Sequence, residues 1–193
     1  MKLRRQYTAA EVGKFLKDSE QEGVASGPGA GHAEGLHELQ AAGRDRPNTT
    51  VQGLIDRAVG EMKEMVGAFD GCQIAAVTFA LNSAAGQNAL GHLEPAGVDF
   101  IFAVIDVQNQ HFRMKEAKAD VYKAPMYGTP LGAYSLGVQN RMVQGVAMKL
   151  MKDDKRQQLH IRTAYPMSAL PGNNPSHCVI TYNTNAQPQN LPI

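Results

Sequence analysis

Residues 143–152 read VQGVAMKLMK and residues 158–165 read QLHIRTAY, on either side of the charged turn DDKR at residues 153–156. Two largely apolar segments joined by a short charged turn are typical of a β-hairpin. The sequence therefore predicts an antiparallel hairpin late in the chain. A helix over residues 138–152 is the competing interpretation of the first segment.

The segments around this hairpin predict further strands. Residues 99–107 form an apolar run in which the hydrophobic period changes from helical to alternating, so we expect a central strand there. Residues 177–182 are the last strand expected, and the polar tail that follows should be loose. Residues 122–136 are rich in Gly, Pro and Tyr, which favours a long loop.

The first part of the chain predicts helices. A capping box formed by Thr8 and Glu11 indicates a helix that ends near Glu20. The glycine-rich residues 23–31 then form a flexible connection. A second helix should begin at residue 48 or 49. Its wide buried face comprises Val51, Leu54, Ile55, Ala58, Val59 and Met62.

Residues 83–93, which are rich in small side chains, predict one more short helix. Helices thus come first and strands later, an order that indicates an α+β fold with N-terminal helices packed on a C-terminal antiparallel β-sheet. We expect one globular unit, in which residues 1–30 supply a helix and a flexible linker and residues 31–193 supply the body.

Composition allows a globular protein but does not identify a partner. Of 193 residues, 43% are hydrophobic and 19% charged, and the net charge is +1. The charge is uneven: residues 1–106 hold 9 Lys and Arg against 14 Asp and Glu, whereas residues 107–193 hold 10 against 4. A basic second half can attract a polyanion, although an ordinary solvated surface explains the same pattern. The two cysteines match neither a zinc pattern nor a disulfide framework.

Strand alternation predicts a polar pair at the end of the hairpin. On a regular strand Ile161, Thr163 and Tyr165 share one face. The other face carries His160, Arg162 and Ala164. The hydroxyls of Thr163 and Tyr165 would then lie side by side, where they can hold a phosphate. A simpler explanation is that both residues were chosen for their strand propensity.

The same segment carries a resemblance to a known group of proteins. Residues 146–166, which end in Thr-Ala-Tyr-Pro, resemble the closing hairpin of bacterial polymorphic toxin ribonucleases of the barnase/EndoU/colicin-like group, the kind delivered by contact-dependent inhibition or type VI systems. Upstream segments are similar in order to the early histidine segment and the middle region of such toxins. These are Gly31-His32 with Leu36-His37, and Thr78-Phe79 with Ser83 and Ala89-Leu90.

The resemblance implies roles for particular residues. His37 would be the general base or acid, with His32 as its rival, and Thr163 and Tyr165 would position the phosphate. Arg162, Lys149 or Lys115 would supply a cation; the resemblance does not decide between them. The implied reaction is RNA cleavage by attack of the 2′-hydroxyl on phosphorus, with no metal and no cofactor.

The resemblance also implies a biological setting. The substrate would be RNA, with tRNA as one candidate, and a cognate immunity protein would protect the producing cell. No apolar stretch of the sequence suits a secretory signal or a membrane span, so we expect export by a specialised system and action in the cytoplasm of a target cell, without a membrane partner.

Two other functions remain open from the sequence. Cys72 precedes an apolar run, His177 begins a strand, and Asn183 follows, which is the chain order of a papain-like cysteine hydrolase. That function requires a helix directly after Cys72, whereas the ribonuclease interpretation expects residues 77–80 to be strand-like. The third possibility is a non-catalytic binding domain with adhesive methionine-rich faces.

Overall fold

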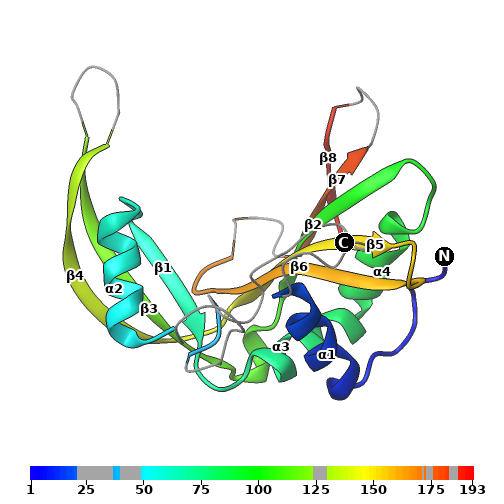
Figure 1. Ribbon diagram of the computed structural model, residues 1–193, viewed down its shortest axis with the longest axis horizontal. Helices are drawn as coiled ribbons and strands as arrows, with labels where there is room; N and C mark the ends of the chain where they lie inside the picture. Colours follow the sequence, from blue (N-terminus) through cyan, green and yellow to red (C-terminus); the bar gives the residue numbers. More distant parts are fainter. Residues whose placement is uncertain (21–36, 40–48, 124–129, 171, 173–175, 183–186) are drawn as a thin grey trace.

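The computed structural model describes the chain except for residues 21–36, 40–48, 124–129, 171, 173–175 and 183–186. Within the described part, helices lie mostly in the first half, and the strands form two antiparallel sheets of five and three strands. The predicted α+β class with N-terminal helices is therefore confirmed. The strands are divided between two sheets instead of the single sheet that the sequence suggested (Figure 1).

The larger sheet has the strand order β6-β5-β2-β7-β8. Its strands are β2 (Val98–Asp106), β5 (Gly145–Asp153), β6 (Gln158–Met167), β7 (His177–Tyr182) and β8 (Gln189–Pro192). The predicted hairpin is confirmed as β5 and β6, and the predicted central strand as β2. The alternative helix over residues 138–152 is wrong. The expectation of a loose tail is wrong for β8, because this short strand pairs with β7.

The smaller sheet has the order β1-β3-β4, formed by β1 (Met65–Phe69), β3 (Arg113–Lys123) and β4 (Pro130–Met142). The loop predicted over residues 122–136 is therefore largely wrong; its residues 124–129 lie outside the described part. The Tyr122 and Tyr134 rings lie 5.4 Å apart across the two strands, and the Tyr134 hydroxyl donates a hydrogen bond to Asp120 (2.7 Å). Edge strands such as β4 tolerate Pro and Gly, which is why composition misled.

Four helices flank the sheets in the described part of the chain: α1 (Ala9–Ser19), α2 (Val51–Gly60), α3 (Gln73–Asn82) and α4 (Ala84–Leu93), with a 3₁₀ turn η1 (Gln108–Gln110). The helices α1, α3 and α4 lie together on one side of the larger sheet, and α2 packs on the smaller one (Figure 1). The buried face of α2 is narrower than predicted. Leu54 and Ala58 are fully buried, whereas Val51 and Met62 remain exposed.

Each sheet has its own hydrophobic core. On the larger sheet, alternate residues of β2, β5 and β7 point toward α1, α3 and α4. They include Ile101, Ala103, Ile105, Val146, Met148, Leu150, Cys178 and Ile180. The opposite side of this sheet has no helix against it among the described elements. We call this side the open face.

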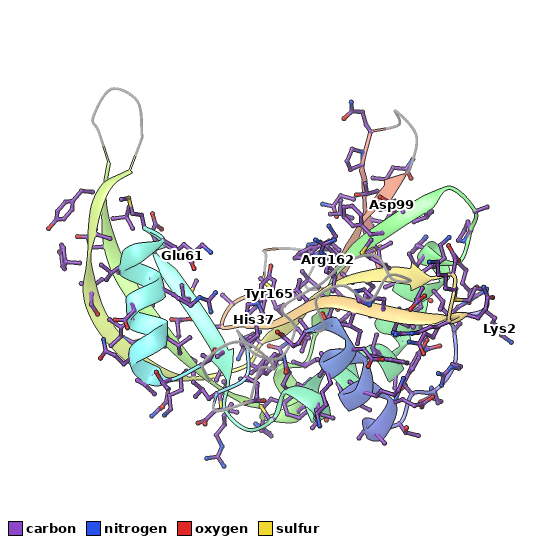
Figure 2. The ribbon with its side chains drawn as sticks, viewed as in Figure 1. Lys2, His37, Glu61, Asp99, Arg162 and Tyr165 are labelled. Atoms are coloured by element: carbon purple, nitrogen blue, oxygen red, sulfur yellow. The ribbon has the colours of Figure 1, made fainter. Side chains whose placement is uncertain are left out.

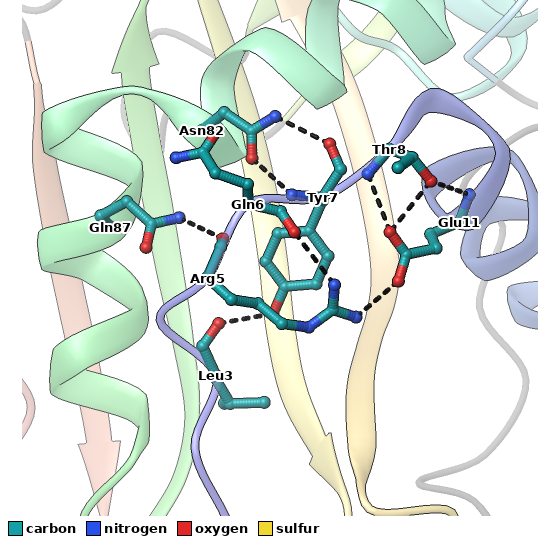
Figure 3. Close-up of polar contacts among 8 residues, drawn as sticks. All are labelled: Leu3, Arg5, Gln6, Tyr7, Thr8, Glu11, Asn82 and Gln87. Carbon is teal, nitrogen blue, oxygen red and sulfur yellow. Dashed lines mark hydrogen bonds and ion pairs between the residues drawn. The ribbon is translucent and has the colours of Figure 1, made fainter.

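The N-terminal segment is fastened to the larger core (Figure 3). The Asn82 side chain accepts a hydrogen bond from the Tyr7 N–H and donates one to the Tyr7 carbonyl, both at 2.8 Å. The capping box of Thr8 and Glu11 is present, as predicted. Through Val12, Phe15 and Leu16, α1 then joins the same core as the sheet. Among the described helices, none has the length and apolar character needed to span a bilayer.

Candidate functional site

A β-bulge in β6 decides which side chains reach the open face. Lys149 of β5 pairs with Thr163, but the next residue, Leu150, pairs with Ile161, so Arg162 is one residue extra. The expected shared face of Ile161 with Thr163 and Tyr165 is therefore wrong. Ile161 and Ala164 both lie in the core, because the alternation changes phase at the bulge. Thr163 and Tyr165 do share a face, and it is the open one.

Three of the residues assigned to chemistry from the resemblance meet in one pocket. His37, Thr163 and Tyr165 line a cavity of about 320 Å³ between β1 and the end of β6. The His37 and Tyr165 rings lie 5.4 Å apart at an angle of 40° (Figure 2). The Thr163 hydroxyl is buried, and none of the described residues forms a hydrogen bond with it. A ligand in the pocket could supply that bond.

The backbone around His37 is held on two sides. The Phe69 N–H donates to the His37 carbonyl (2.8 Å), and the Leu39 N–H donates to the Phe69 carbonyl (3.0 Å), so this segment pairs with the end of β1. The Glu38 carboxylate accepts hydrogen bonds from the N–H groups of Gly71 (2.7 Å) and Gln73 (2.8 Å). Glu38 thus fastens the His37 segment to the start of α3.

The start of α3 is also tied to the strand that carries the hydroxyls. The Gln73 side chain donates a hydrogen bond to the Ala164 carbonyl (3.0 Å), between Thr163 and Tyr165. Burial raises the pKa of the Tyr165 phenol, so it remains a neutral hydrogen-bond donor throughout the physiological range. The pocket therefore combines an imidazole with two hydroxyls on a braced framework.

Two cations that the sequence analysis missed complete the lining. Arg57 of α2 and Lys63 of the following turn lie on the β1 side of the pocket. The Glu61 carboxylate lies between them, 3.6 Å from Arg57 Nε and 2.5 Å from Lys63 Nζ. The pocket wall is therefore net positive. No local motif could have revealed these residues, because α2 and β6 approach each other only in the folded chain.

Gly67 of β1 lies beside Met114 and Pro166. An added Cβ would lie 2.6 Å from Met114 Cε, the flexible end of a side chain that would have to move, and at an ordinary contact distance of 3.8 Å from Pro166 Cγ. Met65, Val66 and Gly67 line the pocket opposite Thr163 and Tyr165. The two sheets therefore meet closely enough to enclose it.

The cations proposed from the sequence lie elsewhere. Lys149 is the cross-strand neighbour of Thr163, but its Nζ lies 3.7 Å from the centre of the Phe100 ring. Arg162 is near enough to Lys149 to lower the pKa of that amine, after burial, the larger cause. Regular strand alternation would point Arg162 away from Thr163, but the bulge interrupts that alternation. Figure 2 shows Arg162 on the side of the sheet away from the helices. Lys115 lines a separate pocket near Asp70.

Cys72 is followed by the helix that a cysteine hydrolase requires, and the strand-like arrangement expected for residues 77–80 is wrong, because they lie in α3. The thiol itself is poorly placed for such chemistry. Burial raises the pKa of Cys72, and the Glu38 carboxylate acts in the same direction. The thiol donates a hydrogen bond to the Arg113 carbonyl (3.1 Å).

The other two members of that triad do not come to Cys72 in the described structure. Cys178 points into the core, so the preceding residue, His177, points to the opposite face of the sheet. Cys72 packs against the core side. Asn183, and His32 of the ribonuclease assignment, lie outside the described residues.

Among the described residues, no three His, Cys, Asp or Glu side chains gather closely enough to hold a metal ion. No family model matches the sequence, and comparisons with curated proteins and with solved structures find no match either.

Proposed function

We propose that the chain is a metal-independent ribonuclease whose active site is the pocket between β1 and β6. One observation carries the proposal: His37, Thr163 and Tyr165, which the sequence suggested as a set, line the same pocket beside two cations. His37 is far from Thr163 and Tyr165 in the chain and has no local reason to meet them. The open face and the positive wall made by Arg57 and Lys63 suit a polyanion.

The reaction forms one bond to phosphorus and breaks another. The 2′-oxygen attacks the adjacent phosphorus, its proton passes to His37, and the bond from phosphorus to the 5′-oxygen breaks, which leaves a 2′,3′-cyclic phosphate. The 5′-oxygen takes a proton from the neutral Tyr165 phenol, and water returns the imidazolium proton to the phenolate. Arg57, Lys63 and the Thr163 hydroxyl stabilise the charge on the non-bridging oxygens.

The test is cleavage of an end-labelled RNA in excess EDTA. We expect products with cyclic phosphate ends, no cleavage of a 2′-deoxy analogue, and a loss of at least about 100-fold in His37→Ala. Thr163→Val and Tyr165→Phe remove single hydroxyls with little change in shape and should each slow cleavage without loss of folding. Cys72→Ser is the matched control and should be fully active.

Two outcomes would overturn the proposal. Intact RNA in every reaction would remove it, and so would full activity in His37→Ala. Intact RNA in every reaction would leave the cysteine hydrolase, with Cys72 as its nucleophile, as the alternative to test next.

The resemblance supports a biological role for such an activity. In this proposal the protein is an effector that reaches the cytoplasm of competing bacteria through a specialised export system, and a cognate immunity protein protects its producer. Expression of the chain inside a bacterial host should arrest growth and degrade RNA, with tRNA examined first. Expression of His37→Ala should permit growth; if both chains are equally harmless, the toxin role fails.

A further inference from the structure

Aromatic rings extend from the pocket across the open face. The Tyr165 ring contacts His37 on one side and lies 6.1 Å from the Phe102 ring, centre to centre, on the other. Phe102 belongs to β2, two strands away from β6. Ala147 of β5 is the direct cross-strand neighbour of Tyr165 and has a side chain short enough for the rings to approach each other above it.

The rings are partly exposed. Tyr165, Phe102 and Phe100 are each neither buried in the core nor fully open to solvent. An ordinary sheet side that faces water carries mainly polar residues. Three accessible rings on neighbouring positions of one face therefore indicate a surface that a flat, unpaired group can occupy.

Positive charge lies beside the rings. Lys149 pairs with Thr163 on one side and with Phe102 on the other, so it is located between the pocket and the ring of β2. Arg162, the residue of the bulge, is close enough to lower the pKa of Lys149, and Asp99 is the carboxylate of the described chain that opposes this effect. Two cations and one carboxylate leave this part of the face net positive, which favours a phosphate.

We infer that the open face binds single-stranded nucleic acid, with a base stacked on Phe102 and the neighbouring phosphate held by Lys149 and Arg162. This inference rests on the proposed function, since it continues the RNA strand from the phosphate in the pocket. It narrows the substrate class to unpaired RNA, because the bases of a duplex are stacked on each other and cannot lie flat on the rings.

The test measures binding separately from cleavage. A short fluorescent 2′-deoxy oligonucleotide cannot be cut by the proposed reaction, yet stacking and phosphate contacts do not need the 2′-hydroxyl. We expect Phe102→Ala to weaken its binding by about 5- to 150-fold, from the usual range for one stacked base. Phe102→Leu keeps an apolar side chain and should lose nearly as much, which guards against a folding defect.

The salt dependence of binding measures the contribution of the positive charge at Lys149. Lys149→Gln should reduce the slope of log affinity against log salt by about 0.7, the value for one lost phosphate contact with a single strand. Tyr134→Ala is the matched control for Phe102→Ala, since this exposed tyrosine belongs to the distant β3–β4 hairpin. Its affinity for the oligonucleotide should equal that of the unchanged protein.

The outcomes separate the two proposals. Ring-dependent binding without RNA cleavage would remove the ribonuclease and leave the binding surface in place. RNA cleavage with an unchanged KM in Phe102→Ala would remove the binding surface and leave the ribonuclease. Binding of a duplex as tightly as a single strand would also overturn the inference.

Discussion

Glu38 is expected to position His37, and Glu38→Ala tests this directly. The substitution removes two hydrogen bonds that a carboxylate accepts from backbone N–H groups, at Gly71 and Gln73. Gly71 is exposed, so water can replace its bond, whereas Gln73 is buried and its N–H loses its partner. We expect the free energy of unfolding to fall by about 2–4 kcal/mol.

Urea unfolding followed by circular dichroism measures that loss. The melting temperature should fall by about 2–4 °C for each kcal/mol, as expected for a chain of this length. Asp154→Ala, which removes an exposed carboxylate from the β5–β6 turn, is the matched control and should change little. RNA cleavage by the folded Glu38→Ala protein should drop further than its stability explains, because the His37 segment is no longer fastened to the start of α3.

The pH dependence provides a second check on Glu38. Burial raises the pKa of this carboxyl, so the native state binds its proton more tightly than the unfolded chain. The associated stability is present below the unfolded value of about 4.3 and is lost as pH rises through the native value. The stability advantage over Glu38→Gln, which does not titrate, should therefore shrink as pH rises. Equal unfolding midpoints for the unchanged protein and Glu38→Ala would refute the anchoring role.

Three further predictions concern the framework. Asn82→Ala removes both hydrogen bonds to the Tyr7 backbone and should lower the free energy of unfolding in urea by about 2–4 kcal/mol. Asn82→Asp keeps only the acceptor and should lose about half as much. An unchanged midpoint would show that the N-terminal segment is not anchored there. Burial lowers the pKa of His160, so the free energy of unfolding should fall as pH drops below about 6.5 toward the native pKa of this residue. His160→Gln should reduce the slope of unfolding free energy against pH by up to about 1.4 kcal/mol per pH unit. Parallel slopes for the two proteins would contradict this prediction. Gly86→Ala would drive a methyl group into backbone carbonyls at the end of α3 and should cost about 3 kcal/mol of stability. Gly60→Ala, whose methyl group meets nothing within 4 Å, should be neutral. Similar melting temperatures for the two variants would refute the close approach of Gly86 to α3.

Local patterns predicted the elements that local forces determine. The capping box of α1 and the β5–β6 hairpin both depend on residues that are close together in the sequence. The β3–β4 hairpin was missed because Gly, Pro and Tyr usually punctuate loops, while here a cross-strand tyrosine pair and an edge position make them compatible with a strand.

The candidate site was only partly predictable for the same reason. Thr163 and Tyr165 are two residues apart on one strand, so alternation alone placed them together. His37 was assigned by resemblance, and its place in the pocket depends on tertiary pairing with Phe69. Arg57 could not be predicted from the sequence, because its helix packs on a different sheet and only the meeting of the two sheets brings Arg57 near β6.

The bulge in β6 lets one extra residue stand in the strand without changing the faces of its neighbours. Leu159 and Ile161 lie in the core before Arg162, and Thr163 and Tyr165 reach the open face after it. If Arg162 were a regular member of the ladder, Ile161 and Thr163 would share a face. Deletion of Arg162 would instead make Ile161 and Thr163 direct neighbours, which a regular strand sends to opposite faces. We therefore expect a chain without this residue to lose the bulge and to keep both the core and the pocket.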